Sequence, residues 1–190
     1  MSTIAKTALP NDMTTEDFFS WSETWSDGER YELVGGEPVR LRSEKVRHAQ
    51  HKLAAVIALR TSLKAVALDC TAFSDGVGVR IDDRSVREPD ALVHCGPFGG
   101  DVMFVSNPVV VVEVFSPSSV RNDTSRKLID YFSVPSIQHY LILLGDEERV
   151  VHHHRTSIEG EIATRILGRG DLVDLSPPGF SVTVEALFDS

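Results

Sequence analysis

The 190-residue sequence predicts an α/β protein in which a mixed sheet is flanked by helices and preceded by an N-terminal hairpin. Apolar residues recur at helical spacing over residues 45–67, which predicts one long helix. Residues 109–115 instead form a continuous β-branched run, which is typical of a strand covered on both faces. Because such a strand needs a packed layer on each side, the pattern favours a sheet between helices.

The amino-terminal part contains a capping box and a glycine turn. Residues 14–17 read Thr-Thr-Glu-Asp, which predicts the start of a short helix. Residues 30–34 and 37–41 are predicted strands that flank Gly35 and Gly36. Two strands joined by such a turn indicate a hairpin.

The remaining elements follow from the same patterns. The long helix is expected to bury one apolar stripe, formed by Ala49, Leu53, Val56, Ile57, Leu63 and Ala67. Residues 70–74 and 77–81 flank an Asp-Gly turn and predict a second hairpin. Later expected elements are strands over 88–93, 109–115, 137–144, 149–155 and 161–167, a helix over 123–132 and a helical turn over 184–188.

The composition excludes several classes of protein. With 42% hydrophobic and 25% charged residues, the chain is neither disordered nor fibrous. Its longest apolar stretches, 108–112 and 140–144, are far shorter than the roughly 20 residues of a membrane helix. Residues 1–12 are expected to be a disordered tail without a secretory signal, followed by a single domain over 13–190.

Cysteine content and charge narrow the setting further. Cys70 and Cys95 are interpreted as small core residues, and so few cysteines favour a reducing, cytoplasmic location. The net charge of −9 argues against a generic nucleic-acid binder. Against that total, the segment 40–64 holds one acid, Glu44, and seven basic residues: Arg40, Arg42, Lys45, Arg47, Lys52, Arg60 and Lys64. This segregation indicates either an anionic partner or a solvated basic face.

A carboxylate interrupts the β-branched run at Glu113. Burying its charge costs several kcal/mol unless a cation compensates it; alternatively, Glu113 is the first polar residue of a strand leaving the core. Asp90 has a similar setting, because apolar strand residues follow it at once. If neighbouring strands bring the two together, their like charges require a divalent cation or a shared proton. Carboxylate ligands suit Mg²⁺.

Two further motifs have ordinary structural explanations. Lys127 lies one turn after Asp123 on its predicted helix, and spacing alone favours a surface ion pair between them. Residues 152–154 are three consecutive histidines. On a strand only His152 and His154 share a face, and two ligands without a third make a poor metal site.

Four segments occur in an order that resembles a known family. They read RYELVGGE over 30–37, EPDALV over 88–93, VEVFSPS over 112–118 and RKLIDY over 126–131. In this order and spacing they resemble the bacterial "putative restriction endonuclease" family, a branch of the PD-(D/E)xK nuclease superfamily, over about residues 13–188. The resemblance implies a restriction-endonuclease-like core. It also implies Mg²⁺- or Mn²⁺-dependent hydrolysis of DNA phosphodiester bonds by a metal-activated water.

The resemblance assigns catalytic roles to individual residues. Asp90 matches the aspartate of "PD" and Glu113 matches the acid of (D/E)xK, so both would bind the metal. Phe115 occupies the position where the superfamily has lysine, and the resemblance therefore assigns that role to Lys127 on the following helix. Glu32 matches a further acid near the metal; as a hairpin residue it could equally be a surface carboxylate.

The basic segment would contact the phosphate backbone of DNA. Its candidate contacts are Lys45, Arg47, His48, Lys52 and Arg60, with a helix cap as the alternative for His48. A homodimer would supply two sites for cutting two strands. The alternative function is a catalytically degenerate nuclease-fold module that acts in nucleic-acid binding or regulation. The acidic net charge and Phe115 favour that alternative.

Overall fold

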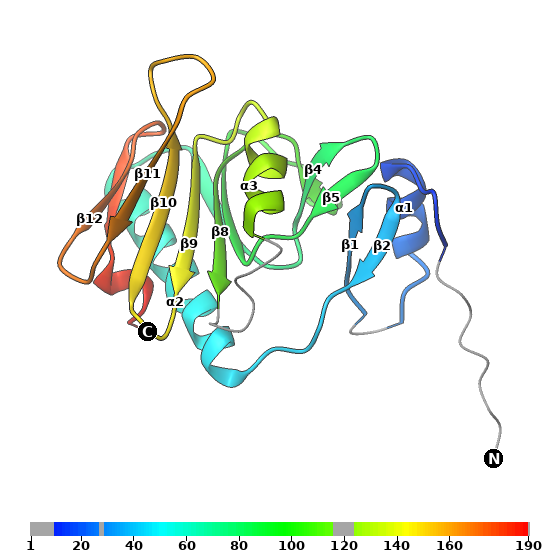
Figure 1. Ribbon diagram of the computed structural model, residues 1–190, viewed down its shortest axis with the longest axis horizontal. Coiled ribbons are helices and arrows are strands. Elements are labelled where there is room, and N and C mark those ends of the chain that lie inside the picture. The colour runs from blue at the N-terminus through cyan, green and yellow to red at the C-terminus, as the bar shows by residue number, and fades with distance from the viewer. Residues whose placement is uncertain (1–9, 27–28, 116–123, 190) are drawn as a thin grey trace.

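The computed structural model describes residues 10–26, 29–115 and 124–189 (Figure 1). The amino-terminal elements are α1 (Thr15–Ser22), β1 (Tyr31–Val34), β2 (Glu37–Arg40) and α2 (Val46–Ala65). The central strands are β3 (Cys70–Ser74), β4 (Gly78–Asp82), β5 (Ser85–Arg87), β6 (Ala91–Cys95), β7 (Phe104–Val105) and β8 (Pro108–Phe115). The carboxyl-terminal elements are α3 (Thr124–Ser133), β9 (His139–Leu144), β10 (Arg149–Arg155), β11 (Ile162–Leu167), β12 (Leu172–Leu175), β13 (Phe180–Thr183) and the 3₁₀ turn η1 (Glu185–Leu187).

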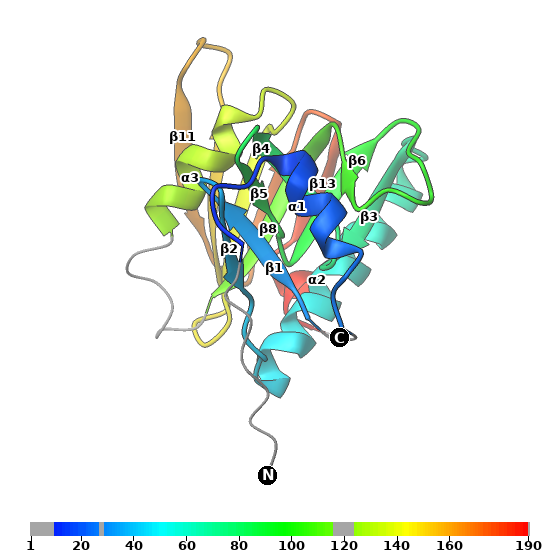
Figure 2. The same cartoon turned by 90° about the vertical axis from the view of Figure 1, so that its right-hand side faces the viewer.

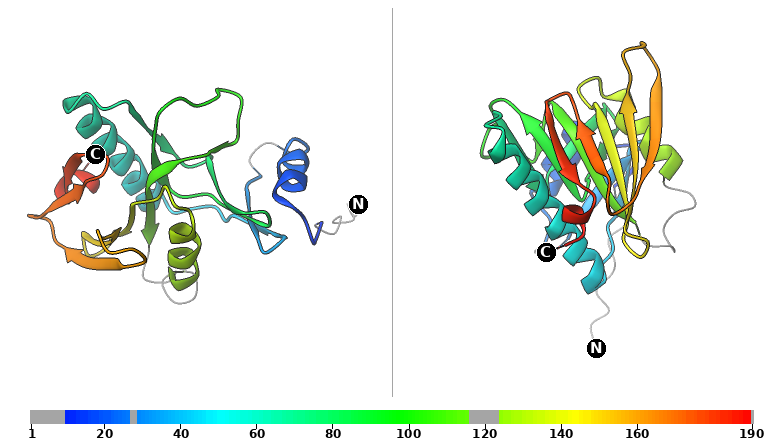
Figure 3. Two further views of the ribbon diagram at one scale, coloured as in Figure 1. Left: turned by 90° about the horizontal axis from the view of Figure 1, so that it is seen from above. Right: turned by 90° about the vertical axis from the view of Figure 1, so that its left-hand side faces the viewer.

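The strands form two mixed sheets and a hairpin, so the predicted α/β class is confirmed. The larger sheet has the order β11-β10-β9-β8-β6-β3, and β8 pairs with β9 in parallel. The smaller sheet has the order β2-β1-β5-β4-β7, with β4 and β7 parallel. Helix α2 packs on one face of the larger sheet together with the β12–β13 hairpin, and α3 packs on the other face (Figures 2 and 3).

Strand β8 is covered on both faces, as its sequence predicts. Val110, Val112 and Val114 point into the core under α2, whereas Val111 and Phe115 point into the core under α3. Side chains alternate along a strand, so Glu113 faces α3. The central strand thus carries its carboxylate into the interior.

The predicted amino-terminal elements are confirmed. The Thr14 hydroxyl accepts a hydrogen bond from the backbone N–H of Asp17, and the Asp17 side chain accepts one from the backbone N–H of Thr14. Strands β1 and β2 pair around Gly35 and Gly36, whose φ angles are +61° and +87°. A turn with two positive φ angles favours glycine at both positions.

The predicted second hairpin is wrong. Strand β3 pairs with β6 in the larger sheet, whereas β4 pairs with β5 in the smaller one. The Asp-Gly turn at residues 75–76 therefore carries the chain from one sheet to the other. Strands β5, β7, β12 and β13 were not predicted, because they are only two to four residues long and lack an extended alternating pattern.

The apolar stripe assigned to the long helix is wrong in part, because Leu63 is buried and Val56 packs against the core but other members are exposed. Leu53 and Ile57 are 56% and 48% exposed, whereas Ala55 and Leu59 are fully buried. Small alanines on the buried face allow the helix to approach the sheet closely, with Leu59 and Leu63 as the large side chains buried there. Lys52, which the pattern places off the buried face, is only 6% exposed. The buried face was therefore misplaced around the helix axis.

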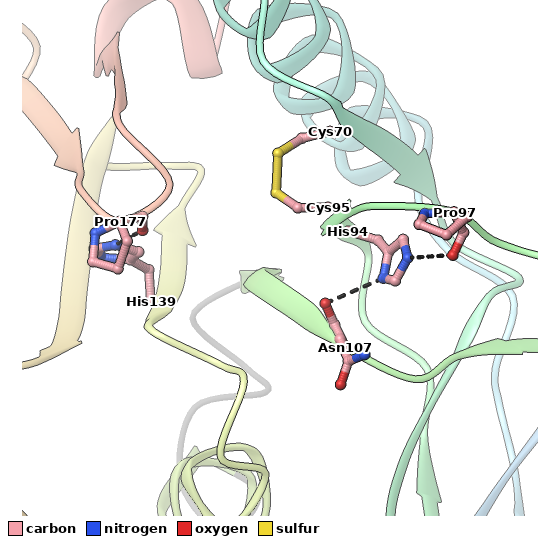
Figure 4. Close-up of a disulfide and its surroundings, with 7 residues drawn as sticks. All are labelled: Cys70, His94, Cys95, Pro97, Asn107, His139 and Pro177. Carbon is pink, nitrogen blue, oxygen red and sulfur yellow. Dashed lines mark hydrogen bonds between the residues drawn. A yellow bond between two sulfur atoms is a disulfide. The ribbon is translucent and has the colours of Figure 1, made fainter.

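The two cysteines form a disulfide, which corrects their interpretation as separate core residues (Figure 4). Cys70 and Cys95 are directly opposite each other in the β3–β6 register, with their Cα atoms 3.9 Å apart. A sequence separation of 25 residues gives no sign of this pairing. The inference of a reducing location from the cysteine count therefore loses its basis.

Some sequence expectations lie outside the described ranges. Most of the expected tail over residues 1–12 does so, as do Asp123 and the predicted end of the strand at residues 116–119. Within the described ranges, none of the helices combines the length and the apolar content that a membrane crossing requires.

Candidate active site

Of the two predicted metal ligands, Asp90 immediately precedes β6 and Glu113 lies on the neighbouring strand β8. In the β6–β8 register Ala91 pairs with Val112, which places Asp90 beside the Glu113–Val114 part of β8. A hydrogen bond of 2.7 Å from the backbone N–H of Val114 to Asp90 Oδ2 fixes this arrangement. In Figure 1 the carboxyl end of β8 and the amino-terminal turns of α2 lie low in the molecule, and α3 begins at about mid-height beside β8. The site is therefore at one end of the larger sheet, between two helices.

Asp90 is bound from the α2 side. Lys52 Nζ lies 2.9 Å from Asp90 Oδ1, and His48 Nε2 lies 3.5 Å from Asp90 Oδ2. Burial by itself raises the pKa of Asp90, but His48, Lys52 and the N–H of Val114 together hold that pKa below its usual value. Asp90 is therefore an anion despite being only 9% exposed.

Lys52 is the centre of a larger cluster. Its ammonium lies 2.7 Å from Glu44 Oε1 and 2.7 Å from Asp75 Oδ2, in addition to Asp90. Burial opposes the charge of Lys52, but the three carboxylates raise its pKa above the usual value. We call the group formed by Glu44, His48, Lys52, Asp75 and Asp90 the α2 centre.

Glu113 is bound from the α3 side. Lys127 Nζ lies 2.8 Å from Glu113 Oε1, and the Tyr131 hydroxyl donates a 2.6 Å hydrogen bond to the same oxygen. Burial raises the pKa of Glu113 to about 7; Lys127 opposes that rise, whereas the charges of Asp90 and Glu32 add to it. Glu113 therefore titrates near neutral pH, in contrast to Asp90.

A buried ion-pair network continues behind Glu113. Glu32 Oε1 lies 3.6 Å from Lys127 Nζ, and Glu32 Oε2 accepts a 2.8 Å hydrogen bond from Arg87. Arg87 also donates to Asp130 at 2.6 and 2.9 Å. Glu32 is thus buried, not a surface residue of the hairpin. We call the group formed by Glu32, Arg87, Glu113, Lys127, Asp130 and Tyr131 the α3 centre.

The donor set at this end of the sheet fits a hard divalent cation. Three carboxylates of the α2 centre converge on one cationic atom, Lys52 Nζ, so the fold already concentrates negative charge around a cation. Among the described residues, Glu44, His48 and Asp90 also offer one ligand atom each within 4.8 Å of one another. Carboxylate oxygens are the ligands that Mg²⁺ and Mn²⁺ prefer.

The five predicted DNA contacts do not lie on one surface. Lys52 and His48 face Asp90, so their side chains belong to the α2 centre. Arg47 is exposed and pairs with Asp146 at 3.0 Å. Lys45 and Arg60 are exposed at opposite parts of the α2 segment, with Arg60 about 21 Å along the helix axis from its first residue. The prediction that Lys52 contacts DNA from the surface is wrong, because its ammonium is buried among carboxylates.

Besides Asp90, Glu113 and Glu32, sequence reasoning named His48, Lys52 and Lys127 as site residues, but it missed the other members of the two centres and the contacts between them. Glu44, His48 and Lys52 follow one another at four-residue spacing, which predicts one helical face and was a usable signal. Lys127 and Tyr131 have the same spacing. The other missed members carried no such signal: Asp75 and Arg87 lie far from the two helices in sequence, and Asp130 is one of several charged residues on its helix.

The histidine run forms a separate buried cluster. His152 and His154 share a face, as predicted, and His139 on β9 lies beside them. His139 Nε2 donates to the carbonyl of Pro177 at 2.8 Å (Figure 4). Its Nδ1 therefore accepts from His152 Nε2 at 2.9 Å. Burial lowers the pKa of His139 to about 4 and that of His152 to about 3, so both are neutral.

A mixed α/β fold with paired carboxylates and lysines at the end of a central strand defines a restriction-endonuclease-like protein. Residues 15–185 match the Uma2 family, described as "Putative restriction endonuclease", and the chain belongs to that family. The chain is 23% identical over 182 residues to the uncharacterized protein slr1290 of Synechocystis sp. (strain ATCC 27184 / PCC 6803 / Kazusa), covering 93% of this chain and 91% of that protein.

The fold is also similar to a solved structure. It matches the crystal structure of a "putative nuclease belonging to DUF820" from Anabaena variabilis ATCC 29413 with a TM-score of 0.69. The match covers 93% of this chain and 97% of that chain at 15% sequence identity. The resemblance inferred from the four sequence segments is therefore confirmed at the level of family and fold.

Proposed function

We propose that this protein is a divalent-metal-dependent endonuclease that hydrolyses phosphodiester bonds of DNA, with Mg²⁺ or Mn²⁺ as the cofactor. One observation carries the proposal. The carboxylates of Asp90, just before β6, and Glu113, on the adjacent strand β8, are each paired with a lysine from a different helix. Buried carboxylates beside lysines suit phosphoryl chemistry, in which a cation and ammonium groups oppose charge that develops on the phosphate.

The residues that would hold the cation are Asp90 and Glu113, with Glu44 and His48 as further donors on the α2 side. A bound divalent cation polarises a phosphate oxygen and lowers the pKa of a bound water. Glu113 must be ionised to serve as a ligand, and its pKa of about 7 makes that step sensitive to pH near neutrality. The site is therefore poised to change its metal affinity within the physiological pH range.

The lysines and the tyrosine have distinct tasks in this proposal. Lys127 is the cation next to Glu113 and supplies the positive charge that the lysine of (D/E)xK would supply from the strand. Tyr131 fixes the same carboxylate oxygen and so orients Glu113. Lys52 and the backbone N–H of Val114 orient Asp90. A lysine on α3 thus compensates for Phe115 on β8.

The proposal is tested by cleavage of supercoiled plasmid and linear duplex DNA with Mg²⁺, with Mn²⁺ and with a chelator. We expect cleavage that needs the metal and that falls at least about 100-fold in Asp90→Asn and Glu113→Gln. Asp101→Asn and Glu159→Gln are matched controls, because both carboxylates are exposed. Wild-type protein that cuts no DNA with either metal, or variants that cut like wild type, would overturn the proposal.

The second candidate is the degenerate module, which binds or regulates nucleic acid without cutting it. Phe115 in the lysine position is the observation that favours it. It predicts DNA binding that is unaffected by Asp90→Asn and a complete absence of metal-dependent cleavage. The same assays, read for binding and for product, therefore separate the two candidates.

The proposed activity has consequences for assembly and location. Cutting both strands of a duplex needs two sites, which a homodimer would supply; sedimentation of the free protein and of its DNA complex tests this. A DNA substrate also favours the cytoplasm, and cell fractionation tests that location.

A further inference from the structure

A cleft lined by arginines opens next to the α2 centre. It has a volume of about 680 Å³, and its lining residues are Arg30, Arg40, Leu41, Arg42, Ser43 and Glu44. Ligand pockets typically measure about 300–1,000 Å³, so this cleft has room for a segment of a chain and not only for a single ion. It is formed mainly by the segment that joins β2 to α2.

Two of the three arginines have charge available for a partner. Arg42 is exposed and has no ion pair within the described ranges. The Arg40 side chain is 59% exposed, and its pairing with Glu29 at 3.7 Å is long and open to solvent. Arg30 is different, because it donates to both Asp75 and Glu88 and is thereby fixed in position. Arg40 and Arg42 can therefore reorient toward an anion, and Arg30 forms the fixed wall.

The cleft leads directly to the proposed catalytic carboxylates. Glu44 lines the cleft and also lies 2.7 Å from Lys52 Nζ, which in turn contacts Asp90. Asp75 connects the other side, because it accepts from both Arg30 and Lys52. An anionic chain lying in the cleft would therefore pass from arginine side chains to the α2 centre without leaving the surface of the protein.

The beginning of α2 adds to this positive surface. The helix starts at Val46, has no acidic residue in its first turn and has no side-chain cap at Lys45. Its amino-terminal N–H groups and helix dipole therefore favour negative charge at the same end of the helix. This feature supports the cleft as an anion path but does not by itself define it.

We propose that the Arg40–Arg42 side of this cleft binds the sugar-phosphate backbone of the nucleic-acid strand next to the scissile bond. The inference rests on the proposed nuclease function and identifies the surface that holds its substrate. Arginine pairs with phosphate oxygens in bidentate geometry, and such contacts position a strand without reading its sequence. The contact surface is therefore the segment before α2, and not the outer face of α2 that the charge pattern suggests.

The inference is tested by the binding of a short fluorescein-labelled DNA duplex to the full-length protein in chelator, measured by anisotropy at several salt concentrations. The double variant Arg40→Gln/Arg42→Gln removes two charges from the cleft. We expect its dissociation constant to rise about tenfold. The magnitude of the slope of log affinity against log salt should decrease by about two, which corresponds to the loss of two phosphate contacts. Thermal unfolding checks that the variant is folded.

The matched control is Lys64→Gln/Arg165→Gln, which removes the same number of charges from exposed positions remote from the cleft. A cleft variant that binds with wild-type affinity and salt slope, or a control that weakens binding equally, would overturn the inference. Neither result bears on catalysis, because binding is measured without metal. Loss of cleavage in Asp90→Asn with normal binding keeps the two proposals separate.

Discussion

The two centres at the end of the larger sheet have similar charges but different access to solvent. Each has three carboxylates and one lysine. In the α2 centre the side chains of Glu44 and Asp75 are 32% and 28% exposed, and the arginine-lined cleft adjoins them. In the α3 centre the side chains of Glu32 and Arg87 are 5% and 3% exposed. One centre is open, and the other is sealed.

Because of this difference, we expect the α2 centre to bind ligands and the α3 centre to position Glu113. Water or a ligand can replace a lost partner in the open centre, so a substitution there mainly changes what the site binds. In the sealed centre a lost partner leaves an uncompensated charge in the interior, so a substitution also lowers the free energy of unfolding. Substrate and metal are therefore expected to enter from the α2 side, while the α3 side fixes Glu113.

The largest expected effect is on the stability of the sealed centre. Arg87→Met leaves Glu32 and Asp130 without their main cation and should lower the free energy of unfolding by about 3–5 kcal/mol. Arg80→Met is the matched control, since its exposed pairs with Glu16 and Asp83 should contribute at most about 1 kcal/mol. Urea unfolding measures both values. Equal losses in the two variants would mean that the α3 centre is not sealed.

The second effect concerns activity and its pH dependence. Lys127 lowers the pKa of Glu113, so Lys127→Met should raise that pKa further above 7. Because the ionised carboxylate binds metal, the pH at which cleavage reaches half its maximum should move upward, and the rate at neutral pH should fall about 100-fold. Lys127→Arg should restore part of the rate. A pH–rate profile that is unchanged in Lys127→Met would contradict the assigned contact.

A third prediction uses the neutral histidine pair as another sealed polar group. The pKa values of His139 and His152 in the folded protein are about 4 and about 3, below the ordinary 6.5. Between pH 6.5 and these folded values, the unfolded chain therefore binds more protons than the folded protein. Their contribution to stability is complete above pH 6.5 and is lost as the pH falls toward 4. As the pH is lowered from 6.5 toward 4, the melting temperature of His152→Phe should therefore decrease less than that of the wild type. At neutral pH the variant should have the lower melting temperature. Equal slopes in the two proteins would rule out this linkage.

The smallest effect is expected on the outer face of α2. Leu53→Gln and Ile57→Gln should change the free energy of unfolding by less than about 0.5 kcal/mol each, because both side chains are largely exposed. Leu59→Ala, on the buried face, should cost about 2–5 kcal/mol. If thermal unfolding shows that Leu53→Gln destabilises the protein as much as Leu59→Ala does, Leu53 is buried, as the stripe predicted from the sequence requires.

The sequence predicts the elements that are long or strongly patterned. The β-branched run of β8, the capping box of α1 and the glycine turn of the first hairpin all depend on local chemistry, and all are confirmed. The second hairpin and the cysteine pairing depend on which strand lies beside which. That information is set by tertiary packing and is absent from a local pattern.

In the candidate site, too, the sequence predicts residues that stand out locally but not those whose role depends on a distant partner. Asp90 and Glu113 are detectable because a charge next to apolar strand residues is anomalous, and Asp90 accepts a hydrogen bond from Val114, the residue after Glu113. Arg87 and Asp130 are not detectable, because each is an ordinary charged residue whose burial follows from the partner supplied by another element. The orientation of Lys52 was missed because leucine and isoleucine outweigh alanine in an apolar pattern, whereas close packing favours alanine.

The most direct test of the account is a crystal structure of the protein soaked with Mn²⁺, with data collected at a wavelength where manganese scatters anomalously. The account predicts one strong anomalous peak within coordination distance of the Asp90 and Glu113 carboxylates, at the end of the larger sheet. The peak should be absent from Asp90→Asn crystals treated in the same way. A manganese ion bound elsewhere, with no density between these two carboxylates, would contradict the account.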